Sequence, residues 1–170
     1  MAGLEDLYRE IILDHYRSPR NRGELPVPPA VRVEGFNPLC GDEVALFVDV
    51  EDDRVVDIKW LGQGCSISQA STSMLTVAVK GKTEAEARAL IRRFKGLMSI
   101  HEQALGGEAD EADGVAEGSD EPEVQLGDLE ALQGVVKFPV RIKCATLSWN
   151  TLIEALDEAD KGDNPDARLV

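Results

Sequence analysis

Three cysteines and one aspartate are the residues of this chain best suited to chemistry. Cys40 and Asp42 lie two positions apart in the run NPLCGD, Cys65 lies in GQGCS, and Cys144 follows VRIK. Thiolates bind metal ions and act as nucleophiles, whereas free cysteines are also common as buried apolar side chains. The cysteines are therefore metal ligands, reactive thiols or core residues, and their local sequence must distinguish these roles.

The polar, glycine-rich surroundings of Cys40 and Cys65 favour a site over a core role, whereas the surroundings of Cys144 do not distinguish the two. An odd number of cysteines argues against a disulfide framework. The glycines around Cys65 permit unusual backbone dihedrals and close approach of the backbone. Cys65 and Cys144 are both predicted at a helix N-terminus, where the helix dipole eases formation of a thiolate. A turn that contains Cys40 and Asp42 can direct both side chains to one point.

Three thiolates and a carboxylate are a plausible tetrahedral set for a divalent metal such as zinc. One oxygen donor makes the site weaker and more easily exchanged than a site with four soft ligands. Such a site carries excess negative charge, and Arg141 and Lys143, just before Cys144, are expected to offset it. His15 and His101 are not expected to be ligands, since a lone histidine needs partners to bind a metal.

The elements that position these residues are predicted from hydrophobic periodicity and turn signals. Alternating apolar residues indicate strands, and Asp52-Asp53 is a plausible hairpin turn between two of them. Capping boxes at Ser66 with Gln69 and at Thr83 with Glu86 indicate helix starts. The predicted helices span about 4–17, 66–80, 83–98 and 145–159, and the predicted strands span 31–36, 43–50 and 55–61.

The order of these elements predicts the fold class α+β, a three-stranded antiparallel sheet packed with helices. The metal site is expected where loops and helix N-termini meet. The chain length of 170 residues fits a single domain, 1–170. Within it, 106–127 is predicted to be an acidic flexible insertion, because residues 108–123 contain eight acids and no Lys or Arg.

The overall charge and hydropathy exclude several classes of function. A formal net charge of −14 disfavours binding to nucleic acid, because an acidic surface repels phosphates. No stretch of 18 or more apolar residues occurs, so no membrane association through a spanning helix is expected. The N-terminal residues mix acids and bases without an apolar run typical of a signal peptide, which predicts a cytoplasmic location.

Three long runs of the sequence resemble the IscU family of iron–sulfur cluster assembly proteins. They are LYREIILDHYRSPRNRGEL, NPLCGDEVALFVDVEDDRVVDIKWLGQGCSISQASTSML and PVRIKCATLSWNTLIEAL. They occur in the order typical of the family and cover most of the chain outside the acidic insertion. The resemblance is closest to the SufU branch, because the IscU branch has a histidine immediately before the third cysteine, where this chain has Lys143.

The resemblance implies a function for the site. Cys40, Asp42, Cys65 and Cys144 match the metal ligands of the family. SufU-like members resemble zinc-dependent sulfur acceptors that take persulfide sulfur from a pyridoxal-phosphate cysteine desulfurase. Members of the IscU branch are scaffolds on which a [2Fe–2S] cluster is built for transfer to apo iron–sulfur proteins. The resident cofactor is thus zinc or, alternatively, iron or a [2Fe–2S] cluster.

Three hypotheses follow. In the first, the chain is a sulfurtransferase relay in which a thiolate released from the metal attacks the persulfide; Cys40 is the preferred acceptor, because it lies in a loop beside Asp42, and Cys144 is the second choice. In the second, the chain is a non-enzymatic scaffold for a cluster. In the third, a structural metal domain serves only as an interaction module, so that metal removal unfolds the chain.

Overall fold

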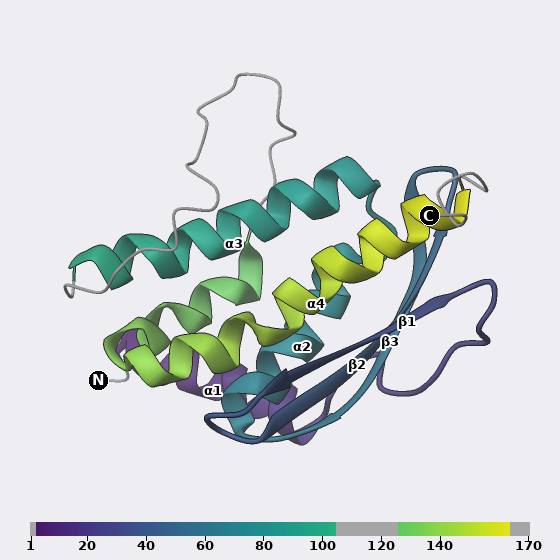
Figure 1. Ribbon diagram of the computed structural model, residues 1–170. Helices are drawn as coiled ribbons and strands as arrows, with labels where there is room; N and C mark the ends of the chain where they lie inside the picture. Colours follow the sequence, from purple (N-terminus) through teal and green to yellow (C-terminus); the bar gives the residue numbers. More distant parts are fainter. Residues whose placement is uncertain (1–2, 105–125, 164–170) are drawn as a thin grey trace.

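The computed structural model describes residues 3–104 and 126–163, in which helices pack against a three-stranded antiparallel sheet (Figure 1). This arrangement confirms the predicted α+β class. The elements are α1 (Leu4–Arg17), β1 (Val31–Asn37), β2 (Asp42–Glu51), β3 (Arg54–Gln63), α2 (Ser66–Val79), α3 (Glu84–Ala104), the 3-10 helix η1 (Gly127–Lys137) and α4 (Pro139–Asp163).

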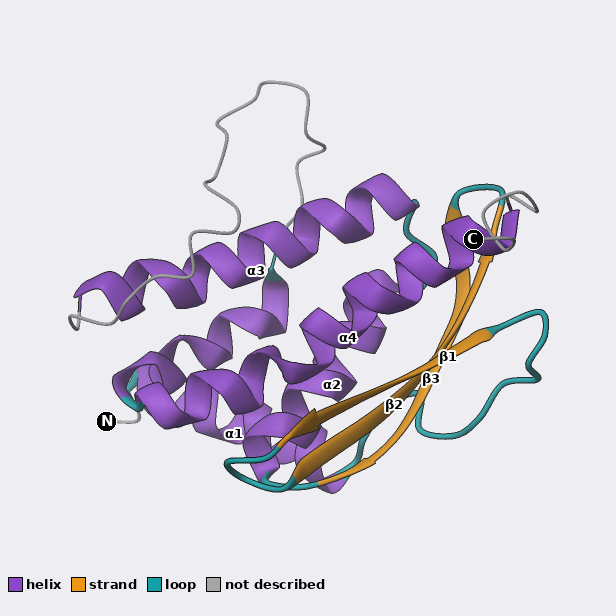
Figure 2. Cartoon of the chain, viewed as in Figure 1, coloured by secondary structure: helices purple, strands orange, loops and turns teal. Residues whose placement is uncertain are grey.

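The sheet is a meander with the strand order β1-β2-β3. Its strands form where apolar side chains alternate, so that one face of the sheet is apolar. Asp52 and Asp53 have φ angles of 50° and 60°, which suit the tight hairpin turn predicted between β2 and β3. An antiparallel meander places the β1–β2 turn and the end of β3 at the same end of the sheet, as Figure 2 shows.

The core lies between the sheet and the helices. Helix α4 contacts β1 and β2, while α2 contacts β3 and α4. Leu46 of β2 and Ile58 of β3 are fully buried. Phe94 of α3 stacks on Trp149 of α4 with ring centroids 4.2 Å apart. Burial of each such large apolar side chain stabilises the fold by roughly 1.5–3 kcal/mol. The site elements therefore rest on a closely packed core.

The connector after α1 covers the free edge of the sheet. The backbone of Trp60 in β3 donates to Asn21 O at 3.1 Å and accepts from Gly23 N at 2.9 Å. The indole of Trp60 also donates to Arg20 O at 2.8 Å. These bonds satisfy edge groups that would otherwise be open to pairing with another strand.

Two helical features differ from the sequence prediction. The 3-10 helix η1 was not predicted, and α4 begins at Pro139 rather than near Ala145. Proline is favoured at the first position of a helix because it has no N–H to leave unpaired, so Pro139 is a start signal that the prediction did not use. The capping box at the start of α3 is confirmed by reciprocal bonds between Thr83 and Glu86.

The predicted acidic insertion at 106–127 lies outside the described residues except for its last two positions.

No helix among the described residues combines the length and the apolar character that a membrane span requires.

Candidate metal centre

Cys40 lies in the tight turn that joins β1 to β2. Asn37 at the end of β1 pairs with Asp42 at the start of β2, which closes the turn. Gly41 adopts a φ of 70°, and its N–H donates to Asn37 O at 2.9 Å. The side chain of Asn37 accepts the N–H of Leu39 at 3.2 Å. These bonds hold the turn, and the side chain of Cys40 is half-buried there.

Asp42 faces the segment that carries Cys65. Its carboxylate is fully buried, and Oδ1 accepts the Cys65 N–H at 2.9 Å. Its other oxygen, Oδ2, lies 3.9 Å from Cys65 Sγ. Gly64 makes this approach possible, because a Cβ at this position would lie 2.3 Å from Asp42 Oδ1. The glycine before Cys65 thus brings the second segment of the site against the first.

Cys65 itself is the N-cap of α2, which corrects the predicted capping box. Its sulfur accepts the N–H of Ser68 at 3.5 Å. The side chain of Gln69 donates to Gly64 O at 2.9 Å instead of returning to Ser66. The N-cap of α2 is therefore Cys65 and not Ser66. The thiol of Cys65 accepts the capping hydrogen bond that the motif assigned to the hydroxyl of Ser66. A helix dipole is favourable to negative charge at this sulfur.

Cys144 lies more than one turn inside α4 and not at its N-terminus as predicted. The helix starts at Pro139, which places Cys144 beyond the first turn, where the helix dipole has largely lost its effect. Its side chain is fully buried, and its sulfur lies 3.3 Å from Cys40 Sγ. Helix α4 thus supplies the third segment of the site.

Three of the four predicted ligands form one group at one end of the sheet, and Cys65 lies beside this group. One ligand atom each from Cys40, Asp42 and Cys144 lie within 4.8 Å of one another, which is the metal-compatible group found among the described residues. Cys65 joins them through its contacts with Asp42. Segments separated by up to about a hundred residues therefore contribute donors to one location, and two of the sulfurs are half-buried while the third is buried.

The protonation of Cys144 differs from the expectation for a thiol at a helix N-terminus. Burial, followed by hydrogen bonds with Asp42 and Cys40, raises the pKa of the Cys144 thiol far above its ordinary value. Because the anionic neighbours oppose another negative charge, this thiol stays protonated unless a cation compensates it. The site is therefore arranged so that a bound cation and the deprotonation of Cys144 favour one another.

Arg141 and Lys143 are placed differently, although both were expected to offset charge. The attraction of Cys65, together with a hydrogen bond to Cys144, raises the pKa of Arg141 above its ordinary value. Its exposed guanidinium therefore faces the thiols. Lys143 is also exposed, but among the described residues no contact joins it to the ligand-type side chains. Arg141, which lines the same groove as Cys65, is therefore better placed than Lys143 to offset the charge of the thiols.

A groove reaches the site from the side of α1 and η1. Its volume is about 700 Å³, and Tyr8, Cys65, Phe138 and Arg141 are among the residues that line it. Leu39, next to Cys40 in the chain, and Phe138, which lines the groove, are exposed apolar residues. A reactant that enters this groove therefore meets Cys65 at its wall.

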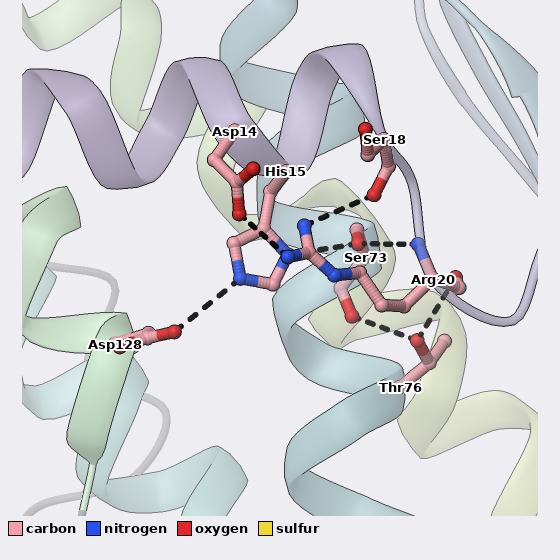
Figure 3. A network of polar contacts seen from close by, with 7 residues as sticks. All are labelled: Asp14, His15, Ser18, Arg20, Ser73, Thr76 and Asp128. Carbon is pink, nitrogen blue, oxygen red and sulfur yellow. Dashed lines mark hydrogen bonds and ion pairs between the residues drawn. The ribbon is translucent and has the colours of Figure 1, made fainter.

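His15 belongs to a separate polar cluster (Figure 3). Its Nδ1 lies 2.9 Å from Ser73 Oγ and its Nε2 lies 3.5 Å from Asp128 Oδ2. The Arg20 N–H donates to Ser73 Oγ, so the serine hydroxyl can donate its proton to Nδ1. Burial, reinforced by Arg20, lowers the pKa of His15 below its ordinary value. The side chain of the other histidine, His101, lies outside the described residues.

The sequence analysis missed the role of one residue of the site and the partner of another. Asn37 was treated as part of a turn, but its side chain donates to Cys144 Sγ at 3.8 Å. The glycines around Cys65 were expected to permit close approach of the backbone, and Gly64 does so, but its partner Asp42 was not predicted. The sequence signals were an asparagine and a glycine beside candidate ligands, and neither signal reveals its partner, which comes from a distant segment.

Comparison with known proteins gives a match to one family. Residues 7–145 match the family described as NifU-like N terminal domain. The chain is 43% identical to the zinc-dependent sulfurtransferase SufU of Bacillus subtilis (strain 168), over 95% of this chain and 97% of that protein. It is 40% identical to the iron–sulfur cluster assembly scaffold protein IscU of Streptococcus pyogenes serotype M1, over 92% of this chain and 86% of that protein.

Solved structures with the same fold agree with this match. FiSufU of the thermophile Fervidobacterium islandicum AW-1, a candidate iron–sulfur cluster assembly scaffold for the SUF system, is 33% identical with a TM-score of 0.68, over 91% of this chain and 99% of that one. The N-terminal part of a nitrogen-fixing NifU-like protein from Brucella abortus has a TM-score of 0.70 at 21% identity, over 93% of this chain and 97% of that one.

Proposed function

The chain belongs to the family of NifU-like N-terminal domains, and from this membership we propose that it is a zinc-dependent relay in iron–sulfur cluster assembly that accepts persulfide sulfur. The observation that carries the proposal is the meeting of Cys40, Asp42 and Cys144 within 4.8 Å, with Cys65 beside Asp42. The name of the Bacillus relative, which is similar over almost its whole length, supports zinc and sulfur transfer.

The donor set suits zinc. Three sulfurs and one carboxylate oxygen, from Cys40, Asp42, Cys65 and Cys144, would hold it, and such mixed sulfur and oxygen sets are within the range that zinc accepts. When bound, zinc would keep the sulfurs deprotonated near neutral pH. Arg141 would offset part of the remaining negative charge, since its guanidinium faces the thiols.

The proposed reaction is an exchange at sulfur. The thiolate of the acceptor cysteine attacks the outer sulfur of a donor persulfide, R–S–SH. A new S–S bond forms on the acceptor, the S–S bond of the donor breaks, and the donor leaves as R–S⁻. The product is a persulfide on this chain, so no external oxidant or reductant is needed. The rate depends on the access of the attacking sulfur and on its thiolate fraction.

Cys40 is the acceptor that we propose. It lies in a turn and is half-buried, whereas Cys144 is fully buried inside α4. Burial and hydrogen bonding also raise the pKa of the Cys144 thiol, which opposes its action as a free nucleophile. Cys144 remains the second choice, since its sulfur lies 3.3 Å from that of Cys40 and could receive sulfur from it.

The proposed donor is a pyridoxal-phosphate cysteine desulfurase, and the proposed recipients are apo iron–sulfur proteins or other assembly components. Free cysteines persist in reducing compartments, so we place this activity in the cytoplasm.

Sulfur transfer from radiolabelled cysteine tests the relay. The zinc-loaded chain, incubated with desulfurase and labelled cysteine, is expected to carry the label on the peptide that contains Cys40, and Cys40→Ser is expected to carry none. Ser66→Ala serves as a control beside the site. Undiminished label on Cys40→Ser would contradict the acceptor assignment, and an unlabelled zinc-loaded wild type would contradict the relay itself.

A scaffold function is the second candidate, favoured by the IscU relative of Streptococcus pyogenes and by the three sulfurs at one site. In that case the cargo is a [2Fe–2S] cluster on Cys40, Cys65, Cys144 and Asp42. Metal analysis of the purified chain separates the two candidates. Tightly held zinc in a 1:1 ratio favours the relay, and iron with acid-labile sulfide favours the scaffold.

A further inference from the structure

The side chain of Asn37 bridges two parts of the site. Asn37 ends β1 and is 6% exposed, although asparagine is usually found at the surface. Its Oδ1 accepts the Leu39 N–H at 3.2 Å, and its Nδ2 donates to Cys144 Sγ at 3.8 Å. One amide thus connects the turn that carries Cys40 with the helix that carries Cys144.

The orientation of this amide follows from its backbone partner. The Leu39 N–H can only donate, so the oxygen of Asn37 must face it. The NH₂ group then faces the opposite direction, toward Cys144 Sγ. A flipped amide would place two donors against each other at Leu39 and remove the donor to the sulfur.

The three sulfurs consequently differ in their N–H donors. Cys65 Sγ accepts the N–H of Ser68 at 3.5 Å, and Cys144 Sγ accepts an N–H of Asn37 Nδ2 from the buried side and interacts with the exposed guanidinium of Arg141. For Cys40, the contact recorded within the described part of the chain is the thiol of Cys144 at 3.3 Å, and no N–H donor is present. Hydrogen bonds from N–H groups reduce the electron density on a thiolate and orient it as a ligand. Two sulfurs are therefore held by N–H groups, and one is not.

We propose that Asn37 is a positioning residue that reserves Cys144 as a permanent metal ligand and thereby leaves Cys40 as the sulfur that is released to react. This inference rests on the proposed zinc-dependent relay. Two sulfurs that lie 3.3 Å apart would then take different roles, because Asn37 donates a hydrogen bond to Cys144 and not to Cys40.

Two variants separate the donor to sulfur from the support of the turn. Asn37→Asp keeps an acceptor for the Leu39 N–H and removes the N–H donor, but it adds a charge. Asn37→Ser also keeps an acceptor near Leu39, is uncharged and is too short to reach the sulfur. Gln63→Glu is the matched control for the added charge, since Gln63 is an exposed amide at the end of β3 that bonds to Glu43.

Two measurements that do not need the desulfurase report the effect. Zinc affinity is expected to fall about 10- to 100-fold in both Asn37 variants, the usual effect of losing a hydrogen bond to a ligand, and to stay unchanged in Gln63→Glu. In the cobalt-substituted protein, both Asn37 variants are expected to shift the sulfur-to-cobalt charge-transfer bands, a readout that a merely structural role would not move.

Limited alkylation of the zinc-loaded protein shows which sulfur is released. The wild type is expected to react first at Cys40, and both Asn37 variants are expected to raise the share of label at Cys144 severalfold. Equal labelling in Asn37→Ser and wild type would overturn the proposal, as would loss of the folded state in both variants, because Asn37 would then act only in the fold. A wild type that binds zinc and shows this order, but accepts no sulfur, would contradict the proposed function and not the role of Asn37.

Discussion

Two clusters of ligand-type side chains lie along α2, and they differ in whether their polar atoms already have partners. The cluster around His15 is closed. Each imidazole nitrogen faces an oxygen, from Ser73 and from Asp128, and the serine oxygen also accepts the Arg20 N–H (Figure 3). The buried imidazole, with a partner at each nitrogen, orders the packing of α1, α2 and η1 and offers no free lone pair to a metal.

The cluster at the start of α2 is open. The sulfurs of Cys40 and Cys144 face each other, and the carboxylate of Asp42 turns one oxygen toward Cys65 Sγ. These groups have acceptors in excess, since thiolates and carboxylates donate no hydrogen bonds when ionised. A cation would balance this excess. Ligand-type residues occur in both clusters, whereas among the described residues the excess of acceptors favours a metal at the second cluster only.

Removal of a sulfur from the open cluster should have the largest effect. Cys144→Ser is expected to weaken zinc binding at least about 100-fold, since even the loss of a neighbour that orients a ligand costs 10- to 100-fold. Competition with a chelator measures this. His15→Gln in the closed cluster is the control and should leave the zinc affinity unchanged. Equal loss of zinc in both variants would abolish the distinction between the clusters.

Gly64 tests whether the open cluster depends on close approach of the backbone. A Cβ in Gly64→Ala would lie 2.3 Å from Asp42 Oδ1, so the carboxylate must move. We expect the variant to lose about 1–3 kcal/mol of unfolding free energy more than Gly81→Ala, and also to bind zinc more weakly. Gly81 is the control because its φ is also positive, 82° against 148° at Gly64, while a Cβ there meets nothing within 4 Å. Equal stabilities of the two variants in urea would argue against the collision.

Ser73 tests the closed cluster. Ser73→Ala leaves His15 Nδ1 and the Arg20 N–H without their partner, and a buried polar group without a partner costs about 1–3 kcal/mol. Thermal or urea unfolding measures this loss, with Ser66→Ala, on the same helix, as the control. The zinc affinity should remain that of the wild type. A loss of zinc without a loss of stability would reverse the roles assigned to the clusters.

The pH dependence of stability is the smallest expected effect. Burial and Arg20 lower the pKa of His15 in the folded chain, despite the opposing effect of Asp128. Between the folded and unfolded values the unfolded chain binds more protons, so stability falls as the pH drops below the unfolded value of about 6.5. Urea midpoints of the zinc-free chain, compared with His15→Gln, measure this contribution. Parallel curves for both proteins would show that His15 does not contribute.

Much of the fold could be predicted from the sequence because local rules determine it. The strands follow from alternating apolar residues, and the capping box of Thr83 with Glu86 marks the start of α3. The start of α4 was predicted too late because the signal of Pro139 was not used. For α2, the sequence motif predicted Ser66 as the capping residue, but the sulfur of Cys65 accepts the capping hydrogen bond.

The site could be predicted by residue type but not by contact. The candidate residues were evident from their types and their loop settings, together with a family resemblance. The contact of Asn37 with Cys144 spans two elements far apart in sequence, and no local pattern specifies it. The same holds for Gly64 and Asp42, since only the packing of β3 beside β2 brings them together.

X-ray absorption at the zinc edge tests the central claim most directly, because it reports the atoms bound to the metal in the intact chain. For a site of Cys40, Asp42, Cys65 and Cys144, we predict three sulfur neighbours at about 2.3 Å and one oxygen neighbour at about 2.0–2.2 Å. A zinc ion surrounded mainly by nitrogen and oxygen, with one sulfur or none, would contradict the account.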